Sequence, residues 1–418
     1  MAKTQQRILI IGVGFAGMWS ALAARRAIAN TEGAAPIEVA VLAPEDKLVI
    51  RPRLYENGPE NMCVSLTDLF ATTGVRFIQG TVDTINTAGR EVGYVDAAGT
   101  QSKLTYDRLV MAAGSRLVRP NIPGLVEHAF SIDRIEEAIQ LDEHLMSLAK
   151  LPPSAARNTA VVCGGGFTGI ELAAELPARM RSILGEDADI RVVVVERAED
   201  IGPELGAGPR PAIIDALQSL GVEMKLGSAV ASLDSSGLTT SSGERIETMT
   251  AAWTAGVAAT ALTKQIPSEK DRFGRLHVDE NLRVKAQRDV FAAGDTAYAS
   301  TDNKGNHALM SCQHAIVLGR TAGHNVAADL LGIPFVPYSQ VQYGTCLDLG
   351  PAGAVVTDGW EREQKIVGAD AKLVKKFVNG MLIYPPKADV VAALAAADPE
   401  WKVPKLDLEM MKASLQVT

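Results

Sequence analysis

The sequence predicts an α/β protein with two Rossmann-like dinucleotide-binding domains and a small C-terminal α+β domain. The main observation is a β-branched strand pattern that runs into G-x-G-x-x-G spacing and then into an Ala-rich helical pattern, at residues 8–24 and again at 159–176. Such glycines allow a tight turn beside a bound pyrophosphate. A change of composition after Pro334 indicates the third domain. Because a single glycine turn also occurs in other α/β folds, the prediction depends on the repetition.

The first glycine turn follows a buried strand of residues 8–11. Its first glycine permits the tight turn, its second lets backbone N–H groups approach a phosphate, and its third lets helix and strand pack closely. The helix that follows offers partial positive charge at its N-terminus. The residues predicted to bind a nucleotide here are Gly12, Gly14, Phe15, Ala16 and Gly17.

The strand expected at residues 37–42 ends without the acidic residue that usually binds the adenosine ribose. Ala43 occupies that position, and Glu45 in the next loop is the nearest substitute. A helix-like segment (65–72), four short strands (76–79, 82–85, 91–96 and 104–106) and an apolar strand follow, and the last strand runs from Arg108 into Ala113-Gly114. A glycine there suits close approach of the backbone to a flat ligand.

The second glycine turn contains Gly164, Gly166 and Gly169 and follows a helical pattern at 132–150 and a Pro-rich linker. The next strand, 190–195, ends at Glu196, in the acidic position that the first unit lacks. A carboxylate there accepts hydrogen bonds from a ribose 2′-hydroxyl and repels a 2′-phosphate, so NADH is favoured over NADPH. The adjacent Arg197 would soften this preference, so NADPH stays an alternative.

The rest of the chain alternates short elements with two longer helices. The pattern predicts a helix at 209–220, short strands leading to Trp-Thr-Ala-Gly256, and a strand that delivers Gly294-Asp295 to a long helix from about His307 to Leu331. Strand-like runs (341–347 and 354–356), a basic stretch (372–377) and an Ala-rich helix (388–397) follow.

Composition excludes several classes of function. The net charge of -8 and the pI near 5.4 are unfavourable for binding nucleic acid, which needs a basic surface. The four scattered cysteines form no C-x-x-C pair, disulfide framework or zinc spacing, which fits a reducing cytoplasm, and no metal site is expected. An apolar run reaching Ala24 has an alternative interpretation as a secretory signal, which the repeated glycine spacing disfavours. No run is long enough to span a bilayer.

The order of these landmarks resembles one family. The chain contains, in this order, a G-x-G-x-x-G turn, Ala-Ala-Gly-Ser, a second such turn, Trp-Thr-Ala-Gly and Ala-Ala-Gly-Asp. This order resembles that of the two-dinucleotide flavoproteins, and among them that of the type II NADH dehydrogenases. The resemblance extends to about residue 350. It implies an FAD-binding domain formed by 1–118 and 263–332, an NAD(P)H-binding domain at 119–262 and a C-terminal domain at 333–418. Beyond the first turn, the implied cofactor-binding residues are Arg51, Ala113, Gly114, Gly164, Gly166, Gly169, Glu196, Gly256, Gly294 and Asp295.

The resemblance also implies chemistry. Hydride would pass from NADH, or with lower preference NADPH, to FAD. Glu171 would help to place the nicotinamide or deliver a proton, and Asp295 would bind the flavin ribitol or pyrophosphate. The helix beginning near His307 would stabilise negative charge on the reduced ring. Gln313 would contact the acceptor, and His314 or His307 would supply a proton.

The electron acceptor is the least determined feature. A quinone-like molecule is preferred, although Val317 and Leu318 replace an expected glutamine, and the segment 406–415 is short and not basic, a poor membrane anchor. One alternative is a soluble reductase of a small redox protein, docked on a basic patch of Lys372, Lys375 and Lys376. Another is a slow redox sensor.

Three further features stay open at this point. They are a homodimer, weak peripheral contact with the inner face of a membrane, and the roles of Cys312 and Cys346. Disulfide reductases of this superfamily carry a redox cysteine pair beside the flavin, which is absent here, and a packed role is favoured for Cys346.

Overall fold

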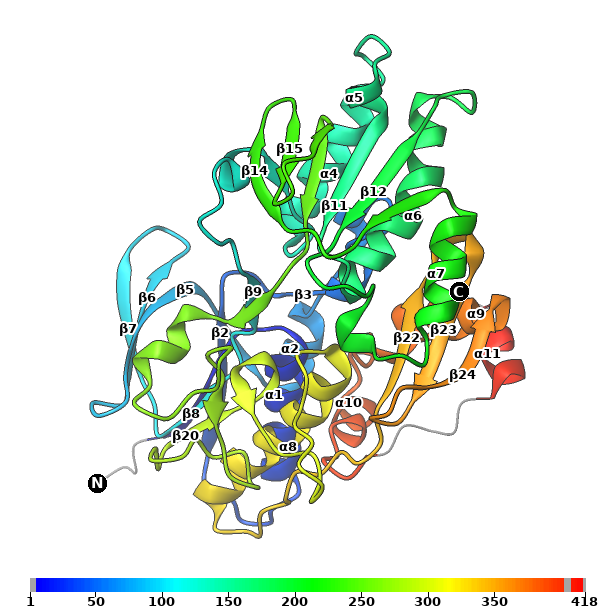
Figure 1. The fold of residues 1–418 in the computed structure, drawn as a ribbon. Coiled ribbons are helices and arrows are strands. Elements are labelled where there is room, and N and C mark those ends of the chain that lie inside the picture. The colour runs from blue at the N-terminus through cyan, green and yellow to red at the C-terminus, as the bar shows by residue number, and fades with distance from the viewer. Residues whose placement is uncertain (1–4, 402–406, 416–418) are drawn as a thin grey trace.

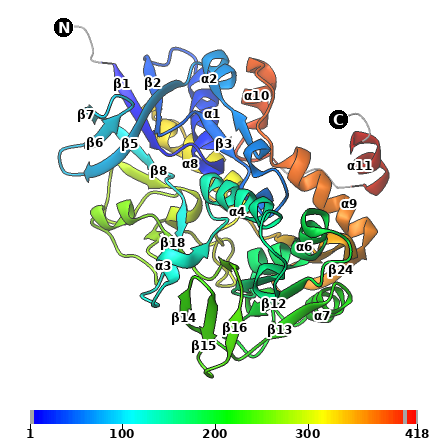
Figure 2. The ribbon, with the colours of Figure 1, turned by 90° about the horizontal axis from the view of Figure 1, so that it is seen from above.

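Two mainly parallel β-sheets form the body of the computed structural model, which describes residues 5–401 and 407–415 (Figures 1 and 2). The first has the order β20-β8-β1-β2-β5-β6-β7. Its strands are β1 (Gln6–Ile11), β2 (Ile37–Ala43), β5 (Arg76–Asn86), β6 (Glu91–Asp96), β7 (Gln101–Thr105), β8 (Arg108–Met111) and β20 (Val290–Ala292). Because β20 pairs with β8, chain segments about 180 residues apart complete one sheet.

The second sheet has the order β10-β17-β11-β12-β13 and is parallel throughout. Its strands are β10 (Ala129–Phe130), β11 (Thr159–Cys163), β12 (Arg191–Val195), β13 (Val222–Lys225) and β17 (Thr250–Trp253). Helices α4 (Ile135–Leu148), α6 (Phe167–Leu184) and α7 (Arg210–Ser219) accompany it, with a small antiparallel sheet of β14 (Val230–Asp234), β15 (Gly237–Thr240) and β16 (Arg245–Glu247). These two sheets confirm the predicted α/β class.

Helices α1 (Phe15–Ala29) and α8 (Cys312–Leu331) pack together against the first sheet (Figure 1). Glycines make their close contact possible. A Cβ atom on Gly319 would lie 2.5 Å from the carbonyl oxygen of Ala16, and one on Gly323 would lie 2.2 Å from that of Ser20. The two glycine positions therefore set how near α8 approaches the helix of the first turn.

The C-terminal part is a three-stranded antiparallel sheet with helices. It contains β22 (Gly344–Asp348), β23 (Ala354–Asp358), β24 (Glu363–Gly368), α9 (Ala369–Phe377), α10 (Val390–Ala396) and α11 (Leu408–Leu415). Helix α10 packs on α1 and on α2 (Thr67–Thr73), and α11 packs on α9 with Met411 buried. Of the predicted segment 406–415, residue 406 lies outside the described residues.

The structure corrects several predicted boundaries. Helix α8 begins at Cys312 and not near His307, because the Ser311 side chain accepts a hydrogen bond from the His314 N–H and caps the helix there. Segments 76–79 and 82–85 are one strand, β5, in which a bulge interrupts the pairing with β6. Strand β22 starts at Gly344 rather than at residue 341.

Substituting Gly323→Ala should destabilise the protein, because its new methyl group overlaps the α1 backbone at Ser20. We expect a loss of about 1–3 kcal/mol in the free energy of unfolding, measured by urea denaturation. Gly380→Ala is the matched control, since a Cβ atom there meets nothing within 4 Å. Equal stability of the two variants would contradict the α1–α8 contact.

Candidate functional site

The first glycine turn leaves its backbone accessible where a phosphate would approach. Gly12 has φ +101°, and a Cβ atom on it would lie 2.4 Å from the Ala112 carbonyl oxygen. A Cβ atom on Gly17 would lie 2.0 Å from the Gly12 oxygen, so the turn and helix require both glycines. In contrast, a Cβ atom on Gly14 meets nothing within 4 Å, and the same holds for Gly114. The residues present therefore fit a dinucleotide lying along this turn.

The Gly294-Asp295 turn packs against the first glycine turn and carries a charged network. A Cβ atom on Gly294, which has φ +64°, would lie 2.8 Å from that of Ala16. The Ser115 hydroxyl donates to Asp295 Oδ2 at 2.6 Å and accepts from Arg51 Nη1 at 3.2 Å. Arg51 also pairs with Asp133. The structure thus brings Arg51 and Asp295 together, directly at 3.8 Å and through Ser115. Sequence reasoning did not identify Ser115 or Asp133 as parts of this network.

The N-terminus of α8 presents two buried polar atoms without a partner in the described chain, Gln313 Oε1 and His314 Nε2. His314 Nδ1 lies 2.9 Å from the Ser311 hydroxyl, and its ring lies 4.7 Å from that of Tyr343 and 5.8 Å from that of Trp360. Burial and nearby arginines lower the pKa of His314 to about 3, so its ring is neutral near pH 7. His307 lies outside this helix and stacks on Tyr298.

The second glycine turn has the same backbone design as the first. Gly164 has φ +117°, and a Cβ atom on Gly169 would lie 1.8 Å from the Gly164 oxygen. Gly166 caps α6, and Gly256 has φ +79° in the loop after β17. Glu196 follows β12, as predicted, and its carboxylate accepts from the Gly165 and Ala198 N–H groups, both at 2.7 Å.

In the first nucleotide-binding unit, Ala43 ends β2 as a buried residue, and Glu45 in the next loop forms an ion pair with Lys47 at 3.2 Å. The substitute carboxylate for the missing ribose-binding acid is thus engaged with a lysine on the surface.

Glu171 forms a buried ion pair with a residue of the C-terminal part. Its Oε1 lies 2.7 Å from Lys375 Nζ and accepts from the Asp348 N–H at 2.9 Å. The Lys375 ammonium lies 5.6 Å from the ring centroids of Tyr55 and of Phe167. The pair is therefore enclosed by side chains from all three parts of the chain.

Burial governs the ionisation of this pair. It raises the pKa of Glu171 from its ordinary value of 4.5 to about 7, against the lowering effect of Lys375. Burial also disfavours the charged form of Lys375, but the Glu171 carboxylate outweighs it and holds the pKa of the ammonium above its ordinary value. The ionised Glu171 thus keeps Lys375 charged, and burial brings the pKa of Glu171 itself close to neutral pH.

The predicted basic patch is wrong. Lys375 is buried in the pair, and Lys372 contacts the carboxylates of Asp348 and Glu175, so only Lys376 of the three faces solvent. Helix α9 turns Lys372 and Lys375, three residues apart, toward α6 and β22.

The two cysteines near the pair are poor nucleophiles. Burial raises the pKa of Cys312 to about 11 and that of Cys346 to about 12, so both thiols are protonated near pH 7. Cys346 donates to the Ala371 carbonyl oxygen at 3.7 Å, a packed role. A Cβ atom on Gly294 would lie 3.5 Å from that of Ala315, so the first turn of α8 lies beside the Gly294-Asp295 turn.

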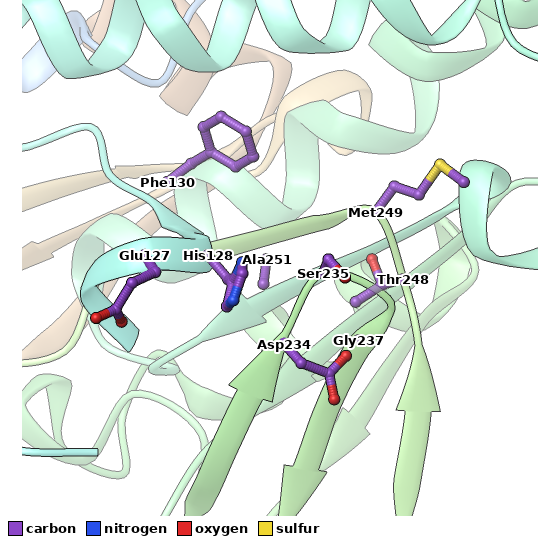
Figure 3. Close-up of a pocket in the computed structure, with 9 residues that line it drawn as sticks. All are labelled: Glu127, His128, Phe130, Asp234, Ser235, Gly237, Thr248, Met249 and Ala251. Carbon is purple, nitrogen blue, oxygen red and sulfur yellow. The ribbon is translucent and has the colours of Figure 1, made fainter. Parts of the chain in front are cut away.

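A separate hollow of about 190 Å³ lies between α3 (Leu125–His128), β15 and β17 (Figure 3). Its lining includes Glu127, His128 and Asp234 and none of the residues predicted from the sequence. An adjoining hollow of about 470 Å³, lined by Arg119, Val126 and Glu137 among others, also contains none of the residues predicted from the sequence. Neither hollow includes a glycine turn, and the candidate site remains at the two turns.

Residues 5–401 and 407–415 contain no group of three or more His, Cys, Asp or Glu side chains arranged to hold a metal ion. No helix among them has the length and apolar character needed to cross a bilayer.

Comparisons with known proteins agree with this geometry. Residues 6–319 match the family model described as pyridine nucleotide-disulphide oxidoreductase. An NADH dehydrogenase-like protein of Mycobacterium tuberculosis is 42% identical over 93% of this chain and 98% of its own. A demethylphylloquinone reductase of Synechocystis is 29% identical over 85% and 88%. The structure of NDH2 from Plasmodium falciparum in complex with NADH superimposes with a TM-score of 0.76 at 14% identity, covering 94% and 98%.

Substituting Lys375→Met should leave Glu171 buried without its cation. We expect a loss of about 3–5 kcal/mol in the free energy of unfolding at pH 8. The loss should shrink toward pH 5, because a carboxyl whose folded pKa is raised favours the fold when protonated and disfavours it as pH rises through that pKa. Urea denaturation across this pH range measures it.

Lys376→Met is the matched control, since its ammonium is exposed on the same helix. The double variant Glu171→Gln/Lys375→Met should recover much of the loss, because neither charge is then buried alone. A pH-independent loss in Lys375→Met would contradict the pair.

Proposed function

Because this chain belongs to the pyridine nucleotide-disulphide oxidoreductase family, as an NADH dehydrogenase-like flavoprotein, we propose that it oxidises NADH with bound FAD and reduces a quinone. It is an oxidoreductase, and its cofactors are FAD and NADH. The observation that carries the proposal is the pair of glycine turns with one backbone geometry in a single chain. The first turn lies beside the Gly294-Asp295 turn and the start of α8, and the second opens helix α6, which carries Glu171.

In this proposal the first turn holds FAD. Backbone N–H groups at Gly14 and Phe15 would receive its pyrophosphate, and the Arg51–Ser115–Asp295 network would hold its ribitol side. Bound FAD supplies a ring that accepts hydride and passes electrons on. Helix α8 would direct its positive end at that ring from Cys312, five residues later than the sequence suggested.

The second turn would bind NADH. Gly166 and the start of α6 would receive the pyrophosphate, and Glu196 at the end of β12 would favour a free ribose 2′-hydroxyl. Glu171, in the first turn of α6, would lie beside the nicotinamide. Because its pKa is close to 7, it is suited to hold a proton that leaves with the reduced acceptor.

A quinone acceptor is supported by the surroundings of Gln313. Its unpartnered side-chain oxygen and the neutral His314 ring lie at the start of α8, and the Tyr343 and Trp360 rings pack against His314. Flat aromatic surfaces and uncharged polar atoms suit a neutral quinone ring. The demethylphylloquinone reductase among the relatives is consistent with this choice. A small acidic redox protein is less favoured, since the basic patch does not exist.

The proposal is tested by adding NADH to the purified protein without oxygen. The visible flavin absorbance should bleach, and a water-soluble menaquinone analogue should restore it rapidly. Steady-state NADH oxidation should be at least about tenfold faster with this quinone than with ferredoxin or with oxygen alone. In Gln313→Leu, bleaching by NADH should persist while turnover with quinone falls about tenfold or more.

A different result would contradict each of the two half-reactions. A preparation that binds no flavin, or one that stays yellow with excess NADH, would contradict the first half-reaction. Rapid bleaching without any fast acceptor would contradict the quinone and favour a redox sensor.

A further inference from the structure

The two glycine turns differ in what faces them. A Cβ atom on Gly14 would meet nothing within 4 Å, whereas one on Gly166 would lie 2.6 Å from Glu204 Oε1. A carboxylate of the chain itself therefore covers the second turn at the position that is open in the first.

Glu204 also takes the hydrogen-bond donor at the start of α6. Its Oε1 accepts from the Phe167 N–H at 2.7 Å. In dinucleotide-binding turns this N-terminal N–H, with the positive end of the helix dipole behind it, binds the pyrophosphate. A pyrophosphate and the Glu204 carboxylate are both anions, so they cannot share this donor.

Glu204 is held by little else. It lies in a short turn (Pro203–Leu205) between Gly202 at φ +59° and Gly206 at φ +75°, and it is exposed. No ion pair to Glu204 occurs within residues 5–401 and 407–415. The Phe167 N–H is thus its main anchor, and moving the side chain breaks one hydrogen bond.

We propose that Glu204 is an internal competitor for the pyrophosphate of NADH, and that it lowers the affinity of the second turn by occupying it when no dinucleotide is bound. This inference depends on the proposed use of that turn for NADH. Under this proposal the two turns have different tasks. The open first turn retains its dinucleotide, while the second releases NAD⁺ and takes up NADH in every cycle. Glu204 would speed that exchange by replacing the departing phosphate at Phe167.

The test measures binding of ADP-ribose, which carries the pyrophosphate and has no redox chemistry, to the FAD-loaded protein by calorimetry. Glu204→Gln keeps the size of the side chain and removes its charge. We expect it to bind ADP-ribose about threefold to tenfold more tightly than the wild type. Its affinity for adenosine, which lacks the pyrophosphate, should not change, and KM for NADH should fall by a similar factor.

Glu199→Gln is the matched control, because it removes the same charge from the same exposed loop without touching α6. Glu204→Ala removes the hydrogen bond as well and should bind ADP-ribose at least as tightly as Glu204→Gln. The flavin absorbance of each variant reports that the fold persists.

Three results would overturn the inference. Unchanged or weaker ADP-ribose binding in both Glu204 variants would make Glu204 a helix cap or a ligand contact. An equal gain in ADP-ribose affinity in Glu199→Gln would show that the effect comes from the net charge of the loop and not from the position of Glu204. If neither the wild type nor any variant binds ADP-ribose, the assignment of the second turn to NADH fails, and the role of Glu204 fails with it.

Discussion

The buried Glu171–Lys375 ion pair is the interaction on which the arrangement of this site depends. Neither charge would be tolerated alone in this environment, because removing a charged group from water costs several kcal/mol. The pair and its hydrogen bond from Asp348 make that burial possible. Since α6 carries the carboxylate and α9 carries the ammonium, the same interaction holds the C-terminal part against the second sheet.

The pair has a consequence for chemistry as well as for packing. A carboxyl with a pKa near 7 titrates in the range where an enzyme works, whereas an exposed glutamate there is fully ionised. Lys375 limits how far burial raises that pKa. The C-terminal part therefore supplies positive charge to the site. Without α9, Glu171 would lack Lys375 and Asp348 would lack Lys372.

The sequence indicated those features that depend on local spacing. The glycines of both turns, Glu196 at the end of β12 and the alternation of strands and helices follow from periodicity and from rigid requirements on φ, and they could be predicted residue by residue. The start of α8 could not, because the serine cap at Ser311 competes with several polar residues between 302 and 311. The basic run was misinterpreted because a list of charges does not indicate which face of α9 meets α6.

What remained invisible in the sequence is what lies opposite each turn. Both turns share one glycine pattern and one backbone geometry, yet the first faces open space and the second faces Glu204, a residue 38 positions beyond Gly166. The glycine motif alone therefore does not determine how a turn binds its dinucleotide, because the side chains that the fold places opposite the turn also contribute. In the second turn those partners are the carboxylates of Glu196 and Glu204, which accept from the Gly165 and Phe167 N–H groups. An enzyme that must keep one dinucleotide and release another has reason to treat two identical turns differently, and the side chains opposite them are where this chain makes that difference.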